Sequence, residues 1–354
     1  MLVLSLLVLL TACSDQGTEP QGTTTKVGFI YVGMIGTEGF TYSHDQGRLY
    51  LEQELGVETM YQEAVDESAE VETVIANMVD QGCNVIFGTS YGFGKYMLNV
   101  ADQYPDVKFL HCSGAQDAEN MNTYFGRMYE PRFLSGLVAG LKTKTNKIGY
   151  VAAYEIPEVI RGINAFTLGV QTVNPEAEVE VVWTHTWYDP ATEKEAALAL
   201  IDNNCDVIAQ HQDTAAPQQA AEERGIAAVG YHSITEKNAP EAYMTAPIWN
   251  WNDYYKSEVE KVIAGTWTPE NVWLGMNDGL VLLAPLTENA PDGAAEIVEE
   301  YQSKIIAGDF HVFSGVITKQ DGTTIGEEGQ ALSDEEMLNM FYFIKGVNGK
   351  IETN

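Results

Sequence analysis

The sequence predicts an α/β protein made of two Rossmann-like lobes, each built on a parallel sheet. Short apolar runs alternate with longer segments whose apolar residues recur at helical spacing, as strands and their covering helices do. Two stretches, 74–89 and 199–213, share one order of features: a helix, a Gly or Asn stop, a Cys and a Val-Ile strand. At 354 residues the chain is long enough for two domains. Chance similarity between α/β units is the alternative explanation of the paired stretches.

The first series of elements opens with a buried strand at 27–32 and a loop punctuated by glycines. Ser43 and Gln46 fit a capping box, which predicts that the first helix begins at Ser43. The apolar pattern then predicts strands at 57–61, 84–87, 107–110 and 123–125, and helices at 71–79, 91–104 and 133–141. We expect the N-terminal lobe to comprise residues 26–127 and a returning segment at about 246–280.

The second series starts at Lys147 and repeats the alternation. Asp189 and Pro190 form a helix cap followed by a first-turn proline. Strands are expected at 147–151, 179–182, 206–209, 226–229 and 279–283, and helices at 163–170, 215–224, 253–264, 294–307 and 335–343. The C-terminal lobe would comprise residues 128–245 and about 281–354, which leaves a cleft between facing strand ends for a small ligand.

The formal net charge of −32 restricts the possible partners. A chain this acidic repels nucleic acid and anionic membrane surfaces, so we expect neither as a partner. Solubility at high salt explains the acidity equally well.

The N-terminus has the pattern of an exported, lipid-anchored protein. Residues 1–12 are predicted to be a signal peptide, although no Lys or Arg precedes its apolar run. Residues 10–13 resemble a bacterial lipobox, which predicts lipidation of Cys13; a chance Cys near an apolar terminus is the alternative. Residues 13–25 would be a flexible tether. We therefore expect the protein on the extracytoplasmic face of the cell membrane, held by a lipid anchor only.

The remaining cysteines and the sequence motifs indicate neither a metal nor a cofactor. Cys83, Cys112 and Cys205 are an odd number without C-x-x-C spacing, and buried packing is expected for Cys83 and Cys205. No zinc, EF-hand or phosphate-loop pattern occurs. The polar residues 211–213 could be metal ligands, but their position at the end of a strand explains their polarity.

Aromatic and polar residues gather where the predicted strands end. This pattern suits a flat, largely uncharged heterocycle that is held by stacking and by a few directional groups. Core packing is the alternative for each aromatic taken alone. The candidate ligand-binding residues are Phe40, Thr41, Tyr42, Ser90, Tyr91, Phe125, Trp187, Gln210, Asp213, His232, Trp249 and Asn250.

Residues 88–92 match the G-x-S-x-G pattern of serine hydrolases, with Ser90 as the nucleophile. The pattern follows a strand and precedes a helix, as that enzyme class requires. The simple alternating series lacks the antiparallel start of the α/β-hydrolase fold, and a Gly/Ser/Thr loop is usual after a ligand-facing strand. We expect no catalytic residues, and keep the hydrolase as an alternative.

Several segments resemble the basic membrane protein family over residues 26–352: VGFIYVGMIGTEGFTYSHDQGR (27–48), NTYFGRMYEPRFLSGLVAG (122–140), DVIAQHQDTA (206–215) and APIWNWNDYY (246–255). Members of this family are lipoproteins that bind purines or purine nucleosides for ABC importers. The resemblance implies a type I periplasmic-binding-protein fold with hinge crossovers, and ABC permease and ATPase subunits as partners.

The resemblance also bears on the ligand. Phe40 matches the family's base-stacking aromatic, whereas the Asp and Lys that the nucleoside-binding branch carries on late loops are replaced by His232 or Ser233 and by Trp249. This departure favours a free base such as adenine over a nucleoside. We expect a monomeric binding protein that is not an enzyme; a ligand-sensing receptor of the same fold is the other alternative.

Overall fold

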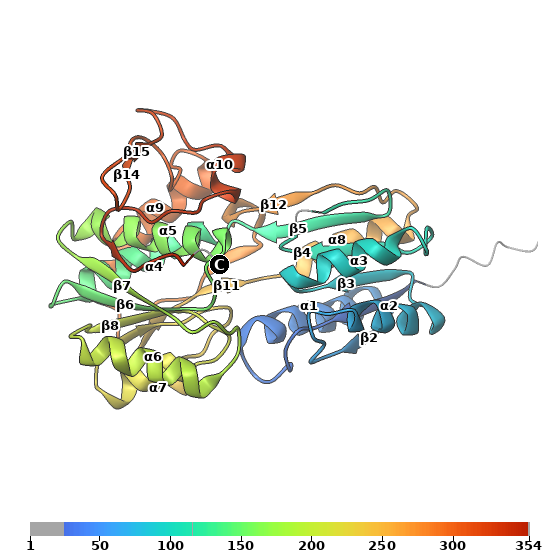
Figure 1. Ribbon diagram of the computed structural model, residues 1–354, viewed down its shortest axis with the longest axis horizontal. Coiled ribbons are helices and arrows are strands. Elements are labelled where there is room, and N and C mark those ends of the chain that lie inside the picture. The colour runs from blue at the N-terminus through green and yellow to red at the C-terminus, as the bar shows by residue number, and fades with distance from the viewer. Residues whose placement is uncertain (1–24, 115, 353–354) are drawn as a thin grey trace, which may run out of the picture.

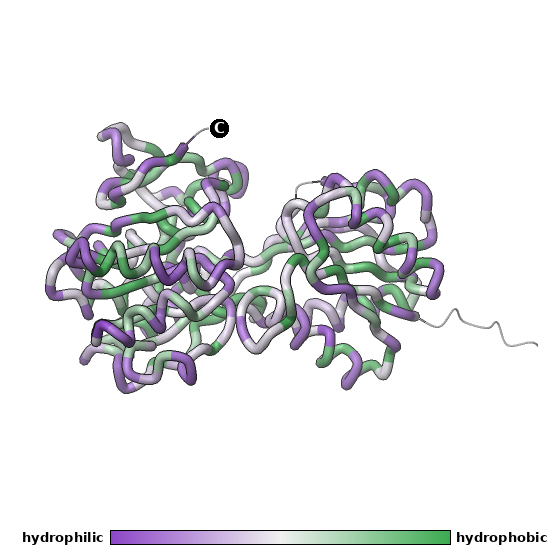
Figure 2. Tube along the Cα trace, turned by 60° about the horizontal axis from the view of Figure 1, so that its bottom comes forward, coloured by the Kyte–Doolittle hydropathy of each residue, from purple (hydrophilic) through white to green (hydrophobic). Residues whose placement is uncertain are grey.

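The computed structural model describes residues 25–114 and 116–352. The predicted signal peptide, Cys13 and almost all of the predicted tether lie outside these residues. Two parallel sheets of six strands each form the centres of two lobes, which lie end to end and are joined by a narrow waist (Figures 1 and 2). The α/β class and the two-lobe architecture predicted from the sequence are confirmed.

The N-lobe is the group of elements around the first sheet, whose strand order is β12-β5-β4-β3-β1-β2. Its strands are β1 (Lys26–Ile30), β2 (Glu58–Gln62), β3 (Val85–Gly88), β4 (Lys108–Cys112), β5 (Met121–Gly126) and β12 (Val272–Leu274). Its helices are α1 (Gly39–Leu55), α2 (Glu70–Asp80), the short 3₁₀ helix η1 (Tyr91–Phe93), α3 (Gly94–Ala101) and α8 (Asn252–Ile263). Alternate strand residues face opposite layers: Phe29 packs on Tyr255 of α8, and Ile30 joins the core formed with α2 and α3.

The C-lobe is the group of elements around the second sheet, whose strand order is β10-β9-β8-β6-β7-β16. Its strands are β6 (Lys147–Ala152), β7 (Glu178–Trp183), β8 (Val207–His211), β9 (Ala227–Val229), β10 (Tyr243–Thr245) and β16 (Val347–Asn348). Its helices are α4 (Tyr129–Lys142), α5 (Pro157–Val173), α6 (Pro190–Asp202), α7 (Ala216–Glu223), the 3₁₀ helix η2 (Glu236–Asn238), α9 (Ala294–Ala307) and α10 (Asp334–Leu338). The pair α4 and α5 covers one face of the sheet, and α6 and α7 cover the other.

The chain passes between the lobes three times. The first crossover joins β5 to α4, the second joins β10 to α8, and the third joins β12 to the strand β13 (Val281–Leu283) through the 3₁₀ helix η3 (Met276–Asp278). The strand β11 (Pro247–Trp249) lies in the second crossover and pairs antiparallel with β13, so the second and third crossovers are hydrogen-bonded to each other. A separate two-stranded hairpin, β14 (Ile317–Thr318) and β15 (Thr324–Ile325), lies in the last part of the chain.

The predicted start of the first helix and the predicted end of the last helix are wrong. The first helix begins at Gly39, not Ser43, and the Ser43 hydroxyl donates to the carbonyl of Phe40 inside the first turn. Ser43 is buried and also accepts a hydrogen bond from Trp251, so its side chain contributes to packing instead of capping. The last helix ends at Leu338, because Asn164 of α5 bonds the carbonyl of Tyr342 and the amide of Ile344 and holds that backbone in a non-helical form.

Cys83, Cys112 and Cys205 are buried and free, in agreement with the packing role predicted for Cys83 and Cys205. Among the helices of the described residues, none combines the length and the apolar character that a bilayer crossing requires.

Candidate functional site

The candidate site is a cavity between the lobes, at the carboxyl ends of the strands of both sheets. It is lined by Val32, Phe40, Ser90, Tyr91 and Ser113 from the N-lobe and by Glu158, Trp187, His211, Asp213 and His232 from the C-lobe. Val32, Ser90, Ser113, Asp213 and His232 follow β1, β3, β4, β8 and β9, and His211 is the last residue of β8. Ligands of open α/β sheets bind at this edge, because the loops after parallel strands meet there.

Phe40 and Trp187 contribute large aromatic surfaces from opposite lobes. Phe40 is the second residue of α1; its ring centroid lies 4.4 Å from that of His44 and 5.2 Å from that of His232. Trp187 lies in the loop between β7 and α6 and packs on Tyr154 with ring centroids 4.9 Å apart. Both rings are partly exposed, so each keeps a surface that a ligand can contact.

Two carboxyl groups lie in the cavity wall. Burial raises the pKa of Asp213 to about 7 and the pKa of Glu158 to about 7, although Arg161 and Arg132 oppose the shift at Glu158. His232 Nε2 lies 3.0 Å from Asp213 Oδ1, and His211 Nε2 lies 3.6 Å from Glu158 Oε1. The wall offers hydrogen-bond acceptors, and the residues described as lining it include no Lys or Arg.

The cavity is narrow as the lobes stand. Its volume is about 30 Å³, which is room for one or two water molecules. A cavity of about 650 Å³ adjoins it and shares Tyr91, Ser113 and Glu158 with it. This wider part runs on to Phe125, Trp273 and Leu338. A ring therefore enters the narrow part only when the lobes separate or the side chains around it move.

The two lobes touch directly beside the cavity. The Glu38 carboxylate, which precedes α1, accepts from the backbone N–H of Ala215 at 2.9 Å and from the Asn238 amide. The backbone N–H of Gly39 donates to Ser233 Oγ at 3.2 Å. Gly39 has a φ of 90°, and a Cβ there would lie 2.3 Å from the carbonyl oxygen of Asp213, so this approach requires glycine. These contacts hold the described structure in a closed form.

The structure brings six of the twelve predicted site residues to the cavity: Phe40, Ser90, Tyr91, Trp187, Asp213 and His232. Trp249 lies behind the wall and donates to His232, and Phe125 packs on Trp249 and lines the wider cavity. Val32, Ser113, Glu158 and His211 also line the narrow cavity and were not predicted as ligand-binding residues. Ser113 and His211 lie at strand ends, so the pattern of residues at strand ends could have identified them. Glu158 reaches the cavity from a helix, where that pattern does not apply.

The other predicted residues do not line either cavity. The Gln210 amide is occupied, because it donates to the carbonyls of Gln212 and Thr214 and accepts from Gln218. Asn250 donates to the carbonyl of Gly279. Tyr42 is half-buried, and Thr41 is buried with a hydroxyl that finds no partner among the described residues.

Ser90 is not bonded to a catalytic base. Its hydroxyl donates to Glu67 Oε1 at 2.5 Å, and His111 contacts the backbone carbonyl of Ser90 instead of its hydroxyl. The triad of G-x-S-x-G hydrolases requires a histidine at the hydroxyl, so this geometry does not favour the hydrolase alternative. In the described part of the chain, no cluster of His, Cys, Asp or Glu could hold a metal ion.

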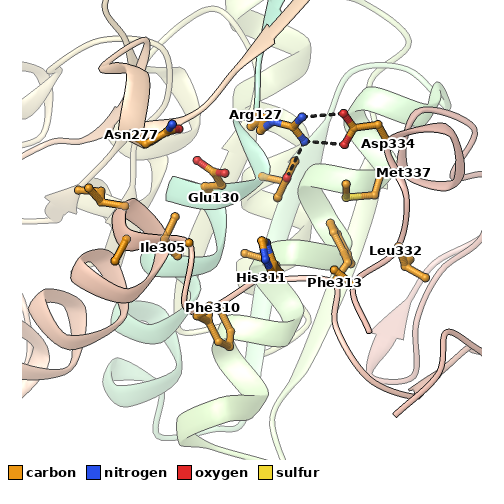
Figure 3. A pocket seen from close by; sticks show the side chains of 16 residues that line it. Arg127, Glu130, Asn277, Ile305, Phe310, His311, Phe313, Leu332, Asp334 and Met337 are labelled. Carbon is orange, nitrogen blue, oxygen red and sulfur yellow. Dashed lines mark hydrogen bonds and ion pairs between the residues drawn. The ribbon is translucent and has the colours of Figure 1, made fainter. Parts of the chain in front are cut away.

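A groove of about 430 Å³ lies beneath the last part of the chain and shares Arg127 and Asp334 with the wider cavity (Figure 3). Arg127 lies there beside Asp334, and the two form a bidentate ion pair with N–O distances of 2.8 and 2.7 Å. Glu130 accepts from the backbone N–H of Met276. Because these charged groups already have partners, the interlobe cavity is the better candidate site.

Known proteins share both the sequence and the fold of this chain. A purine-binding protein of Brucella abortus is 42% identical over 328 residues, which cover 92% of this chain and 93% of the relative. A Haloferax volcanii protein, provisionally named as a glucose-binding protein of an ABC transporter, is 38% identical over 96% of this chain and 84% of its own. An ABC transporter solute-binding protein of Aeropyrum pernix has the same fold, with a TM-score of 0.71 at 21% identity over 81% of this chain and 92% of its own.

The sequence pattern of one family, Bmp, described as ABC transporter substrate-binding protein PnrA-like, matches residues 24–310. That match spans both sheets except β16, and it includes every residue that lines the narrow cavity. The chain therefore belongs to the Bmp family of PnrA-like ABC transporter substrate-binding proteins.

Proposed function

We propose that this substrate-binding protein captures a purine-like ring between its lobes and delivers it to the permease and ATPase of an ABC importer. The observation that carries the proposal is that Phe40 of one lobe and Trp187 of the other line one cavity with two carboxyl groups. Aromatic faces bind a flat ring by stacking, and carboxyl oxygens accept from its N–H groups. The Brucella abortus relative, a purine-binding protein by name, supports the same ligand class.

The ligand is a free base such as adenine, or a nucleoside. The narrow cavity would hold the ring, with Asp213 as the acceptor for its N–H edge. The wider cavity beside Tyr91 and Glu158 offers space for a substituent.

We take the lobes to be residues 26–127 with 246–280 and residues 128–245 with 281–354. They are hinged at the three crossovers, so that ligand contacts stabilise the closed form.

The family is extracytoplasmic, and we further propose that the chain is a monomer anchored by lipid on Cys13 after removal of residues 1–12. It would bind no nucleic acid, require no cofactor and catalyse no reaction. The mass of the mature N-terminus, measured on protein purified from membranes, tests the anchor: an unmodified Cys13 would contradict it.

Calorimetry with adenine, guanine, their nucleosides and glucose tests the ligand class. We expect Phe40→Ala to weaken purine binding at least tenfold, because stacking of a base on an aromatic ring contributes about 1–3 kcal/mol and 1.4 kcal/mol is about tenfold. Tyr42→Ala is the matched control, since Tyr42 lies on the same helix and does not line the cavity; its affinity should stay within about twofold of the wild type.

Two outcomes would contradict the proposal. Heat from glucose with none from any purine would exclude the ligand class, and the name of the Haloferax volcanii relative makes glucose the necessary comparison. An unchanged affinity in Phe40→Ala would remove that ring from the site.

A further inference from the structure

His232 lies between a cavity residue and a crossover between the lobes. On one side its Nδ1 accepts from the indole N–H of Trp249 at 2.9 Å. On the other side its Nε2 lies 3.0 Å from Asp213 Oδ1. The ring is almost completely buried, so these two contacts fix both of its nitrogen atoms.

The contact with Trp249 determines where the imidazole carries its proton. An indole nitrogen only donates, so Nδ1 must be unprotonated to accept from it. Burial and the nearby Arg132 guanidinium hold the pKa of His232 well below its usual value, which keeps the ring neutral. A neutral imidazole without a proton on Nδ1 carries it on Nε2, the nitrogen that lies 3.0 Å from Asp213 Oδ1.

This contact occupies one oxygen of the Asp213 carboxyl and leaves the other available. Oδ1 lies 3.0 Å from His232 Nε2, and the backbone N–H of Asp213 donates to the carbonyl of Trp187 at 3.2 Å. Among the residues that the structure describes, none donates a hydrogen bond to Oδ2. Because Asp213 lines the cavity, Oδ2 of its ionised carboxylate is the atom that can accept from a ligand.

We propose that His232 is a positioning residue that holds Asp213 as a fixed hydrogen-bond acceptor for the ligand and links that acceptor, through Trp249, to the second crossover. The proposal rests on the proposed function, in which Asp213 contacts the ligand. His232 acts on the ligand through Asp213, and its Nε2–H tautomer is the property that gives it this role.

The backbone supports this role independently of the side-chain contacts. His232 has a φ of 66°, in the left-handed region that few residues other than Gly, Asn, Asp and His adopt. The backbone N–H of Trp249 donates to the His232 carbonyl at 3.2 Å, and His232 forms an isolated parallel bridge with Ile248. Both the backbone and the ring of His232 are thus bonded to the crossover strand β11.

The link continues into the N-lobe. Trp249 stacks on Trp251 with centroids 4.7 Å apart and planes 13° apart. Trp251 stacks on His44 at 4.4 Å and donates to Ser43 Oγ at 3.3 Å, and both partners belong to α1, the helix that carries Phe40. A chain of direct contacts therefore joins the acceptor in the C-lobe to the stacking ring in the N-lobe.

Two substitutions separate the two bonds of His232. In His232→Gln the amide nitrogen takes the place of Nε2 and can still donate to Asp213. In His232→Asn the amide oxygen takes the place of Nδ1 and can accept from Trp249, but nothing donates to Asp213. The backbone at position 232 has a positive φ, which Asn tolerates better than Gln does. Backbone strain therefore does not explain weaker binding by His232→Asn than by His232→Gln.

The probe is adenine, with affinity measured by calorimetry and thermal stability measured in parallel. We expect His232→Asn to bind at least tenfold more weakly than the wild type and His232→Gln to bind within about threefold, because only His232→Gln keeps the donor to Asp213. Unchanged affinity in His232→Asn would overturn the proposal. Equal losses in both variants, at equal thermal stability, would also overturn it, since they would indicate packing alone.

A ligand-free measurement keeps the proposal separate from the proposed function. Long-range ¹H–¹⁵N spectra distinguish the two imidazole tautomers, and His232→Asn assigns the signal by its loss. We expect the Nε2–H form; an Nδ1–H form would overturn the positioning role. A wild-type protein that binds no purine contradicts the proposed function, while the tautomer still decides the role of His232.

Discussion

Glu193, near the start of α6, has a fully buried carboxyl group. Its Oε2 accepts from the Thr214 hydroxyl at 2.6 Å and its Oε1 accepts from the backbone N–H of Asp189 at 3.0 Å. Burial outweighs these bonds and raises the pKa of Glu193 to about 7. Between about pH 4.5 and pH 7 the folded protein therefore binds this proton more tightly than the unfolded chain does.

The sign of the stability effect follows from this difference. A carboxyl group whose pKa is raised by folding stabilises the folded protein at pH values below its pKa in the unfolded chain. That contribution is lost as the pH rises through about 7. The loss amounts to roughly 3 kcal/mol for a pKa moved from 4.5 to about 7. We expect Glu193→Gln to lose less unfolding free energy than the wild type between about pH 5 and pH 8.

Urea unfolding at the two pH values measures this difference. The exposed Glu195→Gln on the same helix is the control and should follow the wild type. Identical pH dependence in Glu193→Gln and the wild type would show that the buried carboxyl group does not titrate in this range.

At the scale of elements, α4 and α5 pack unusually closely because glycines meet at their contact. A Cβ on Gly169 would lie 2.0 Å from the carbonyl oxygen of Phe133, and a Cβ on Gly136 would lie 2.1 Å from that of Phe166. These obstacles are backbone atoms, so no side-chain rotation relieves them. The two helices cover one face of the C-lobe sheet, which makes this contact part of the support for β6 and β8.

Gly169→Ala should therefore destabilise the protein by about 1–3 kcal/mol, because the helices must separate to admit the methyl group. Gly162→Ala on the same helix is the matched control: the nearest atoms to a Cβ there are 3.7 Å away, an ordinary contact. It should stabilise the protein by about 0.5–1 kcal/mol through helix propensity. Urea unfolding midpoints measure both, and equal effects of the two substitutions would contradict the glycine contact.

The long strands and helices were predictable because each carries its own apolar period. The strands β12 and β16 were not, because their pairing with β5 and β7 joins distant parts of the chain, which a local sequence pattern does not show. The pattern of polar and aromatic residues at strand ends selected Asp213 and His232, and both line the narrow cavity. It also selected Gln210, because a sequence does not reveal that the side-chain amide of Gln210 is already hydrogen-bonded to neighbouring residues.

At the scale of the whole molecule, Glu38 joins the lobes without lining the narrow cavity. It precedes α1 of the N-lobe, and both groups that donate to its carboxylate belong to the C-lobe. The contact exists only when the lobes are closed, so it shifts the equilibrium between open and closed forms.

Glu38→Ala should raise the ligand dissociation rate at least tenfold with little change in the association rate, because a hydrogen bond to a charged group contributes about 1.5–3 kcal/mol and 1.4 kcal/mol is about tenfold. Glu54→Ala is the matched control, since it also removes one carboxylate from the N-lobe and its partner Lys256 is in the same lobe. Stopped-flow kinetics and the radius of gyration of the ligand-free protein test the effect. Unchanged dissociation and an unchanged radius would exclude Glu38 as a closing contact.

The parallel pairing of β16 with β7 means that the C-lobe sheet is completed by nearly the last residues of the chain. The N-lobe sheet is likewise completed late, by β12 beside β5. A nascent or shortened chain that ends at residue 310 has the outer edge of β7 bare and lacks Met340 and Phe343, which cover part of the apolar core. Bare strand edges invite pairing with another molecule, so the final forty or so residues protect this protein against self-association as well as completing its fold.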